Sequence, residues 1–74
     1  MTLDELYQVE IIRDTTLVRI IEPLSRIYEM VHTGRWSDPD IRKYGGRTFD
    51  GLRWSRKEDE VTVRLAEDWE NTEL

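Results

Sequence analysis

The chain has 74 residues, of which 38% are hydrophobic, with no cysteine and a formal net charge of −5. This length fits one domain over residues 1–74, and the absence of cysteine excludes disulfides and cysteine-based metal or catalytic sites. The sequence contains no run of about 18 apolar residues that could span a bilayer. Its first residues lack the basic and apolar regions of a signal peptide, so we expect a soluble, cytoplasmic, non-membrane protein.

Two segments near the N-terminus are rich in β-branched residues and predict a β-hairpin. The first runs from Tyr7 to Arg13 and the second from Thr16 to Glu22, and Asp14 and Thr15 separate them. β-Branched and aromatic residues favour strands, and a short polar connection between two such runs is typical of a hairpin turn.

The next segment changes to helical spacing and predicts one central helix. Leu24, Ile27, Tyr28 and Val31 follow one another at positions i, i+3, i+4 and i+7, which places them on one face of a helix. A proline is tolerated in the first helical turn and a glycine often ends a helix, and Pro23 and Gly34 stand at those two places.

The rest of the chain predicts an irregular basic loop followed by a C-terminal hairpin. Residues 35–47 are polar, and Asp38 and its neighbours are suited to cap one short helical turn before the Gly45–Gly46 pair. Residues 48–55 and 60–65 predict two strands, the second with clear apolar alternation. The predicted fold class is therefore α+β.

Two alternative folds remain open at this point. The helical spacing continues from Leu17 straight through Pro23, which would give a winged-helix-like fold with a Thr2–Glu5 capping box and a basic wing at Arg56–Lys57. An interior proline costs about 3 kcal/mol or more, which disfavours that long helix. The other alternative is an all-β meander or small barrel, with a turn at residues 22–25 and a strand over 26–33.

Catalytic and metal-binding patterns are weak. The single histidine, His32, forms one Glu-x-x-His spacing with Glu29, whereas di-iron bundles need two such motifs and further carboxylates. The Gly45–Gly46 pair lacks the spacing of a phosphate-binding loop, and Asp38 and Asp40 are not followed by calcium ligands. We expect no enzyme activity, cofactor or metal; the catalytic alternative is His32 as a general base oriented by Asp38 or Glu29.

Charge is segregated along the chain. Residues 1–34 carry three arginines against six acids, residues 35–57 carry seven cations against three acids, and residues 58–74 carry one arginine against seven acids. The middle segment interleaves these cations with aromatic residues, and arginine with tryptophan is typical of interface contacts. The candidate partner-binding residues are Trp36, Arg42, Lys43, Tyr44, Arg47, Arg53, Trp54, Arg56 and Lys57.

These features favour a non-enzymatic protein-binding module. Trp36 is expected to be exposed and is the first candidate contact, whereas Trp54 suits a contact or a core position equally. On size and composition alone, an inhibitor or accessory protein of the phage or mobile-element type fits, and a homodimer would add stability to so small a domain. The hypothesis for the acidic tail, residues 67–74, is that it folds over the basic segment.

Nucleic-acid binding or transcriptional regulation is the alternative function. The same cations would contact phosphates, and Trp36 or Tyr44 would stack on an unpaired base. Acidic flanks and a negative net charge disfavour it, because domains that bind nucleic acid usually carry a basic balance.

Overall fold

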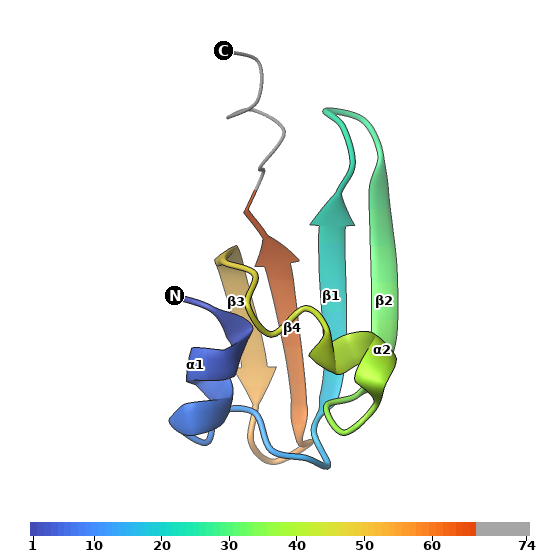
Figure 1. Cartoon of the computed structure of the whole chain (residues 1–74). Coiled ribbons are helices and arrows are strands. Elements are labelled where there is room, and N and C mark those ends of the chain that lie inside the picture. The colour runs from blue at the N-terminus through green and yellow to red at the C-terminus, as the bar shows by residue number, and fades with distance from the viewer. Residues whose placement is uncertain (67–74) are drawn as a thin grey trace.

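The chain folds into a four-stranded mixed sheet with two short helices (Figure 1). The computed structural model describes residues 1–66, so the acidic tail predicted at 67–74 lies outside the described residues. In chain order the elements are α1 (Leu3–Gln8), β1 (Leu17–Pro23), β2 (Glu29–Arg35), α2 (Pro39–Arg42), β3 (Phe49–Ser55) and β4 (Glu60–Leu65).

The strand order in the sheet is β2-β1-β4-β3. β1 and β2 form an antiparallel hairpin from Leu17 opposite Arg35 to Pro23 opposite Glu29. β3 and β4 are also antiparallel, with an irregularity between Phe49 and Gly51. The central pair, β1 and β4, is parallel and joins the two antiparallel pairs into one sheet.

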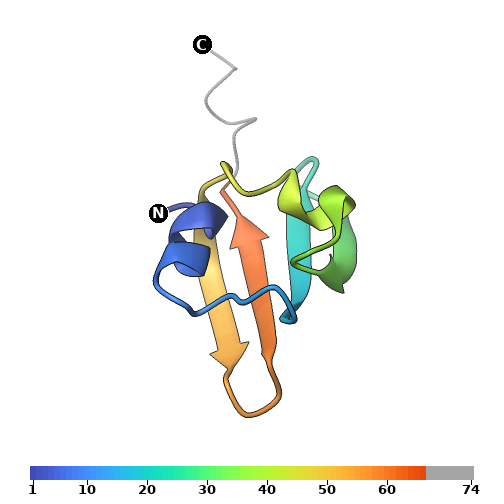
Figure 2. The ribbon, with the colours of Figure 1, turned by 60° about the horizontal axis from the view of Figure 1, so that its bottom comes forward.

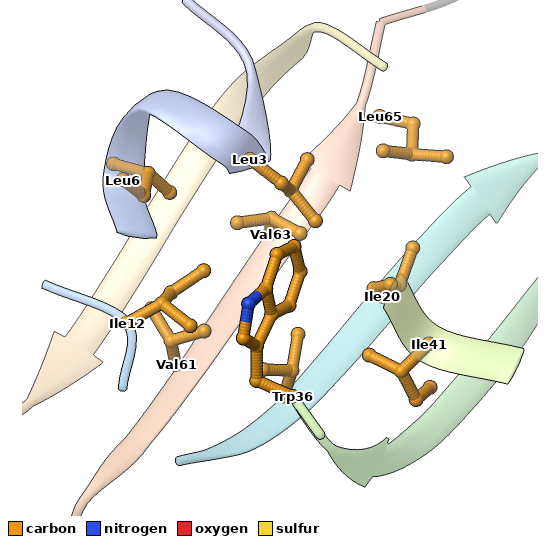
Figure 3. Close-up of a cluster of buried hydrophobic side chains, with 10 residues drawn as sticks. Leu3, Leu6, Ile12, Ile20, Trp36, Ile41, Val61, Val63 and Leu65 are labelled. Carbon is orange, nitrogen blue, oxygen red and sulfur yellow. The ribbon is translucent and has the colours of Figure 1, made fainter. Parts of the chain in front are cut away.

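The core lies on one face of the sheet, under both helices (Figure 2). In β4, Val61, Val63 and Leu65 are buried and alternate with Thr62 and Arg64 on the opposite face, as the pleat of a strand requires. The other buried apolar side chains come from α1, the connection after it, β1, the residue after β2 and α2: Leu3, Leu6, Ile12, Val18, Ile20, Trp36 and Ile41. Figure 3 shows most of them packed over the sheet.

The strand predicted over Tyr7–Arg13 is wrong, because the chain starts with helix α1 and continues in an irregular connection. Thr2 and Glu5 form a reciprocal capping box at the start of α1. After α1, the backbone N–H groups of Ile11 and Ile12 both donate to the carbonyl of Leu6. Ile12 is buried in the core. Ile11 and Ile12 therefore pack against the core while Val9 is exposed, and the segment does not extend the sheet.

The predicted central helix is also wrong, since its residues form the turn of the first hairpin and strand β2. The turn closes where the N–H groups of Leu24 and Ser25 donate to the carbonyl of Tyr28. The four residues of the expected helical stripe are all exposed. Gly34 lies within β2 and ends no helix. The strand that the all-β alternative placed over 26–33 is nearer to the observed β2.

The remaining predicted elements occur where the sequence places them. Strand β1 covers the segment expected as the second N-terminal strand, and β3 and β4 match residues 48–55 and 60–65. The short helical turn forms as α2, where the Asp38 side chain accepts the N–H of Asp40 at 2.9 Å. The α+β class is confirmed. In the part of the chain that the structure describes, neither helix has the length and apolar character needed to cross a membrane.

Candidate protein-binding surface

Trp36 was predicted to be exposed, and this prediction is wrong because its side chain is 0% exposed. Directly after β2, the N–H of Trp36 donates to the carbonyl of Thr16. The indole lies among the core residues against the sheet (Figure 3). It stacks on Tyr7 with ring centroids 5.8 Å apart. The guanidinium of Arg42 lies over both rings, 5.3 and 5.9 Å from their centroids. Trp36 is thus a core residue that supports α2 and is unavailable to a partner.

The other predicted contact residues do not form one surface. Arg42 and Lys43 belong to α2 and its C-cap, on the helix-covered side of the sheet. Arg53 pairs with Thr62, whose side chain lies on the opposite face. Trp54, at 44% exposure, lies opposite the buried Val61 on the edge strand β3. The segment that is continuous in sequence is divided between two faces and one edge.

Four of the predicted residues form two cation–π contacts, Arg56 with Trp54 and Lys43 with Tyr44. The Arg56 guanidinium stacks 5.5 Å from the Trp54 ring and donates to the carbonyl of Glu10 at 3.3 Å. The Lys43 Nζ lies 5.5 Å from the Tyr44 ring. Arg56 and Lys57 stand in the turn between β3 and β4. These contacts hold cations against aromatic rings of the same chain.

Tyr44 and one further predicted residue, Arg47, belong to a polar cluster with Glu22 and His32. The Nε2 atom of His32 lies 2.9 Å from a Glu22 carboxylate oxygen and 3.1 Å from the Tyr44 hydroxyl. Arg47 donates to the other Glu22 oxygen at 3.3 Å. The hydrogen bond from His32, assisted by Arg47, holds the pKa of Glu22 below its ordinary value against the opposing effect of burial.

The polar cluster links the β1–β2 hairpin to the loop after α2. Asp38 and Glu29, the expected orienting partners of His32, are engaged elsewhere: Asp38 caps α2, and Glu29 pairs with Arg64 at 3.5 Å. Glu22 takes that position, a contact that neither residue spacing nor local pattern indicates. No group of three or more His, Asp or Glu side chains suited to a metal ion occurs among residues 1–66.

The largest concentration of exposed apolar side chains lies in residues 24–31, here called the hairpin tip. Five of the nine large hydrophobic residues that are exposed in the described chain fall in this segment. β4 accompanies β1 only as far as Ile21, so the hairpin extends past its neighbours (Figure 1). The exposed residues of the hairpin tip are Leu24, Ile27, Tyr28, Met30 and Val31.

Sequence reasoning missed the hairpin tip as a surface because it assigned the same apolar residues to the inner face of a helix. The apolar residues were recognised in the sequence, but their exposure was not. They are exposed because the hairpin extends past the rest of the sheet, and no local sequence pattern indicates that extension. Ile27 alone is 84% exposed.

The face of the sheet opposite the helices is a shallow hollow with paired charges. Arg64 contacts Glu29 and Asp50 at 3.5 and 3.6 Å, and Arg19 donates to Thr62 at 3.3 Å. These cations are engaged within the chain, so the hollow is less apolar and less available than the hairpin tip.

Comparisons of this chain with protein-family models, with curated proteins and with solved structures found no match.

Proposed function

We propose that this protein is a non-enzymatic protein-binding module whose contact surface is the hairpin tip. The observation that carries the proposal is the concentration of five exposed apolar side chains, one of them a tyrosine and one a methionine, within residues 24–31. Aromatic residues and methionine are enriched at protein interfaces. Fully burying one large apolar side chain contributes about 1.5–3 kcal/mol, so a partner that covers several of them gains appreciable affinity.

The shape of the hairpin suits insertion into a groove. Met30 and Val31 project to opposite faces of β2, because successive residues of a strand alternate. A partner can therefore contact the tip from both sides. An inhibitor or accessory role fits this geometry, since a projecting hairpin can occupy the groove that another ligand of the partner uses.

The arrangement of cations supports a protein partner over a nucleic acid. Phosphate backbones require several cations on one continuous surface. Here Arg42 and Lys43 lie on the helix side, Arg53 lies on the opposite face, and the net charge of the chain is −5. Binding a protein through the apolar hairpin tip does not require an excess of cations on this chain.

Affinity capture with matched variants tests the proposal. The immobilised full chain is exposed to a lysate of the organism that encodes it, at low and high salt, with and without nuclease. Ile27→Lys removes an apolar contact and adds a cation at the hairpin tip. Val9→Lys makes the same charge change at a residue that is 57% exposed at the end of α1, away from the tip (Figure 1).

We expect one protein to be retained by the wild type and by Val9→Lys, in high salt and after nuclease treatment, and to be lost with Ile27→Lys. Circular dichroism of each variant checks that the fold is intact. Equal retention by both variants would contradict a contact at the hairpin tip. Loss of every captured protein on nuclease treatment would instead support the nucleic-acid alternative.

A further inference from the structure

We infer that the chain forms a two-fold symmetric dimer in which β2 pairs antiparallel with β2 of a second copy, with His32 beside the symmetry axis. This goes beyond the proposed function, because it uses the backbone edge of β2 and the charges at its two ends. It shares Glu29 and Val31 with the hairpin tip but does not use the side chains of its turn, residues 24–28.

β2 is an edge strand without a bulge, a proline or a lysine. β2 and β3 are the outer strands of the sheet in the described residues. Proteins protect such edges with bulges, prolines, charged side chains (lysine above all), very short strands or a covering helix or loop. β3 has an irregular register between Phe49 and Gly51. β2 has seven residues in unbroken register with β1, without proline or lysine. Of the two edges, β2 is the one open to another strand.

The hydrogen bonds to β1 show which groups of β2 point outward. Trp36 donates to Thr16, and Leu24 donates to Tyr28 across the same hairpin. In an antiparallel pair, hydrogen-bonded positions alternate along the strands. The even-numbered residues of β2 therefore face β1, and the N–H and C=O groups of Glu29, Val31 and Thr33 and the N–H of Arg35 face away from it. These are the groups that a second strand would engage. The C=O of Arg35 already accepts the N–H of Asp38 at 2.9 Å.

Charge complementarity selects the register. Two-fold pairing centred on His32 places Glu29 of each copy opposite Arg35 of the other, so that two pairs of opposite charge form at the ends. It also places Val31 opposite Thr33 twice. Centring on Val31 would put Glu29 opposite Thr33, and centring on Thr33 would put Val31 opposite Arg35. Only the His32 register of these three matches acid with base.

The side chains that would pair are accessible on one face. Glu29 and Arg35 are both exposed, and both lie on the face of the sheet away from the helices. Glu29 contacts Arg64 at 3.5 Å, and Arg35 donates one hydrogen bond to the carbonyl of Thr15 at 2.9 Å. A guanidinium carries five N–H donors, so Arg35 is suited to bind a carboxylate as well.

Pairing of two seven-residue edges buries less surface than a stable interface requires, so the dimer is weak and concentration-dependent. Sedimentation equilibrium of the full chain over a dilution series measures it. Arg35→Glu or Glu29→Arg turns two attractive pairs into two repulsive ones. We expect either to raise the dimer dissociation constant about tenfold or more, and the double variant to restore it.

Amide exchange adds a readout specific to the edge. The N–H groups of Val31 and Thr33 should become protected as concentration rises, because carbonyl groups of the second copy would accept them. A wild type that stays monomeric up to about 1 mM would overturn the inference. So would a dimer unaffected by both charge reversals, or one whose Val31 and Thr33 amides exchange freely.

The same series separates this inference from the proposed function. Ile27→Lys changes the turn of the hairpin tip and leaves the backbone edge and the Glu29–Arg35 charges intact, so it should dimerise like the wild type. A dimer lost with Ile27→Lys but kept in both charge reversals would overturn edge pairing. Loss of a captured partner with unchanged dimerisation would uphold both.

Discussion

At the scale of single residues, Trp36 is buried although its neighbours indicate exposure, and Trp54, which suits a contact or a core position equally, is partly exposed. Trp36 lies between Arg35 and Ser37, polar residues that indicate a surface position, yet it is the largest side chain in the core. Trp54 stands in a clear strand but remains 44% exposed because β3 is an edge. Neighbours in sequence do not report which side of the sheet a loop covers.

Replacing each tryptophan by alanine should therefore have unequal effects. Trp36→Ala leaves a cavity in the core and should lower the free energy of unfolding by about 3–5 kcal/mol, which approaches the whole stability of a small domain. Trp54→Ala should cost much less, because its side chain is already partly solvated. Urea denaturation followed by circular dichroism measures both, and equal losses would contradict the burial of Trp36.

Glu22 should make stability depend on pH. Its lowered pKa means that the folded state favours the carboxylate, chiefly through the hydrogen bond from His32 and then through Arg47. The contribution is fully present above the ordinary pKa of 4.5 and is lost as pH falls through the lowered folded-state pKa. Glu22→Gln should destabilise the protein by about 1–3 kcal/mol at neutral pH and by progressively less in acid.

Glu58→Gln is the matched control for this measurement, since Glu58 is an exposed turn residue. Urea denaturation of both variants and the wild type near pH 7 and near pH 3 gives the comparison. A Glu22→Gln deficit that is as large in acid as at neutral pH would show that the charge of Glu22 is not the source of its effect.

At the scale of elements, α2 depends on a glycine in β2. A Cβ at Gly34 would lie 2.8 Å from Cγ1 of Ile41, the buried residue of α2. The absence of a side chain therefore lets α2 approach the sheet. The sequence analysis interpreted the same glycine as the end of a helix. That interpretation rested only on the position of Gly34 after a row of apolar residues.

Gly34→Ala should destabilise the protein by about 1–3 kcal/mol, because the added methyl group overpacks the contact with Ile41. In an ordinary strand the same change would be stabilising by about 0.5–1 kcal/mol. Gly46→Ala is the control, since nothing lies within 4 Å of a Cβ at that position. Thermal unfolding of both variants tests this, and a Gly34→Ala variant as stable as wild type would contradict the close approach.

Elements with strong local signals were predictable and short or ambiguous ones were not. The alternation of Val61, Val63 and Leu65 identified β4, and Asp38 before Pro39 identified α2. α1 has only six residues, too few for helical periodicity, although its Thr2–Glu5 capping box was visible. The hairpin tip was misassigned because its apolar spacing also fits a helix. The spacing of apolar residues in a sequence does not show whether their side chains are buried or exposed.

At the scale of the whole molecule, the parallel pairing of β1 with β4 brings together segments more than forty residues apart. Val18 lies beside Val61, and Leu17 donates to the carbonyl of Asp59. Thr15 and Thr16 both donate to the Asp59 carboxylate at 2.7 Å, which lowers the pKa of that group. Nothing local in either segment indicates this arrangement, because parallel strands require a long connection.

The division of the basic segment is a consequence of the same topology. The chain leaves β2, crosses the helix side of the sheet as α2 and its following loop, and then enters the far edge as β3. Its cations are therefore distributed over several surfaces although they are adjacent in sequence. For that reason the hairpin tip, and not this segment, is the candidate surface.

The sequence by itself determined the α+β class, strands β1, β3 and β4, the cap of α2 and the distribution of charge along the chain. These depend on alternation, capping and composition, which act over a few residues. Only the tertiary structure decided that Trp36 is buried, that the hairpin tip is exposed and that Glu22 meets His32. Those outcomes depend on which face of the sheet a distant segment covers, and burial of apolar surface across the whole chain decides that.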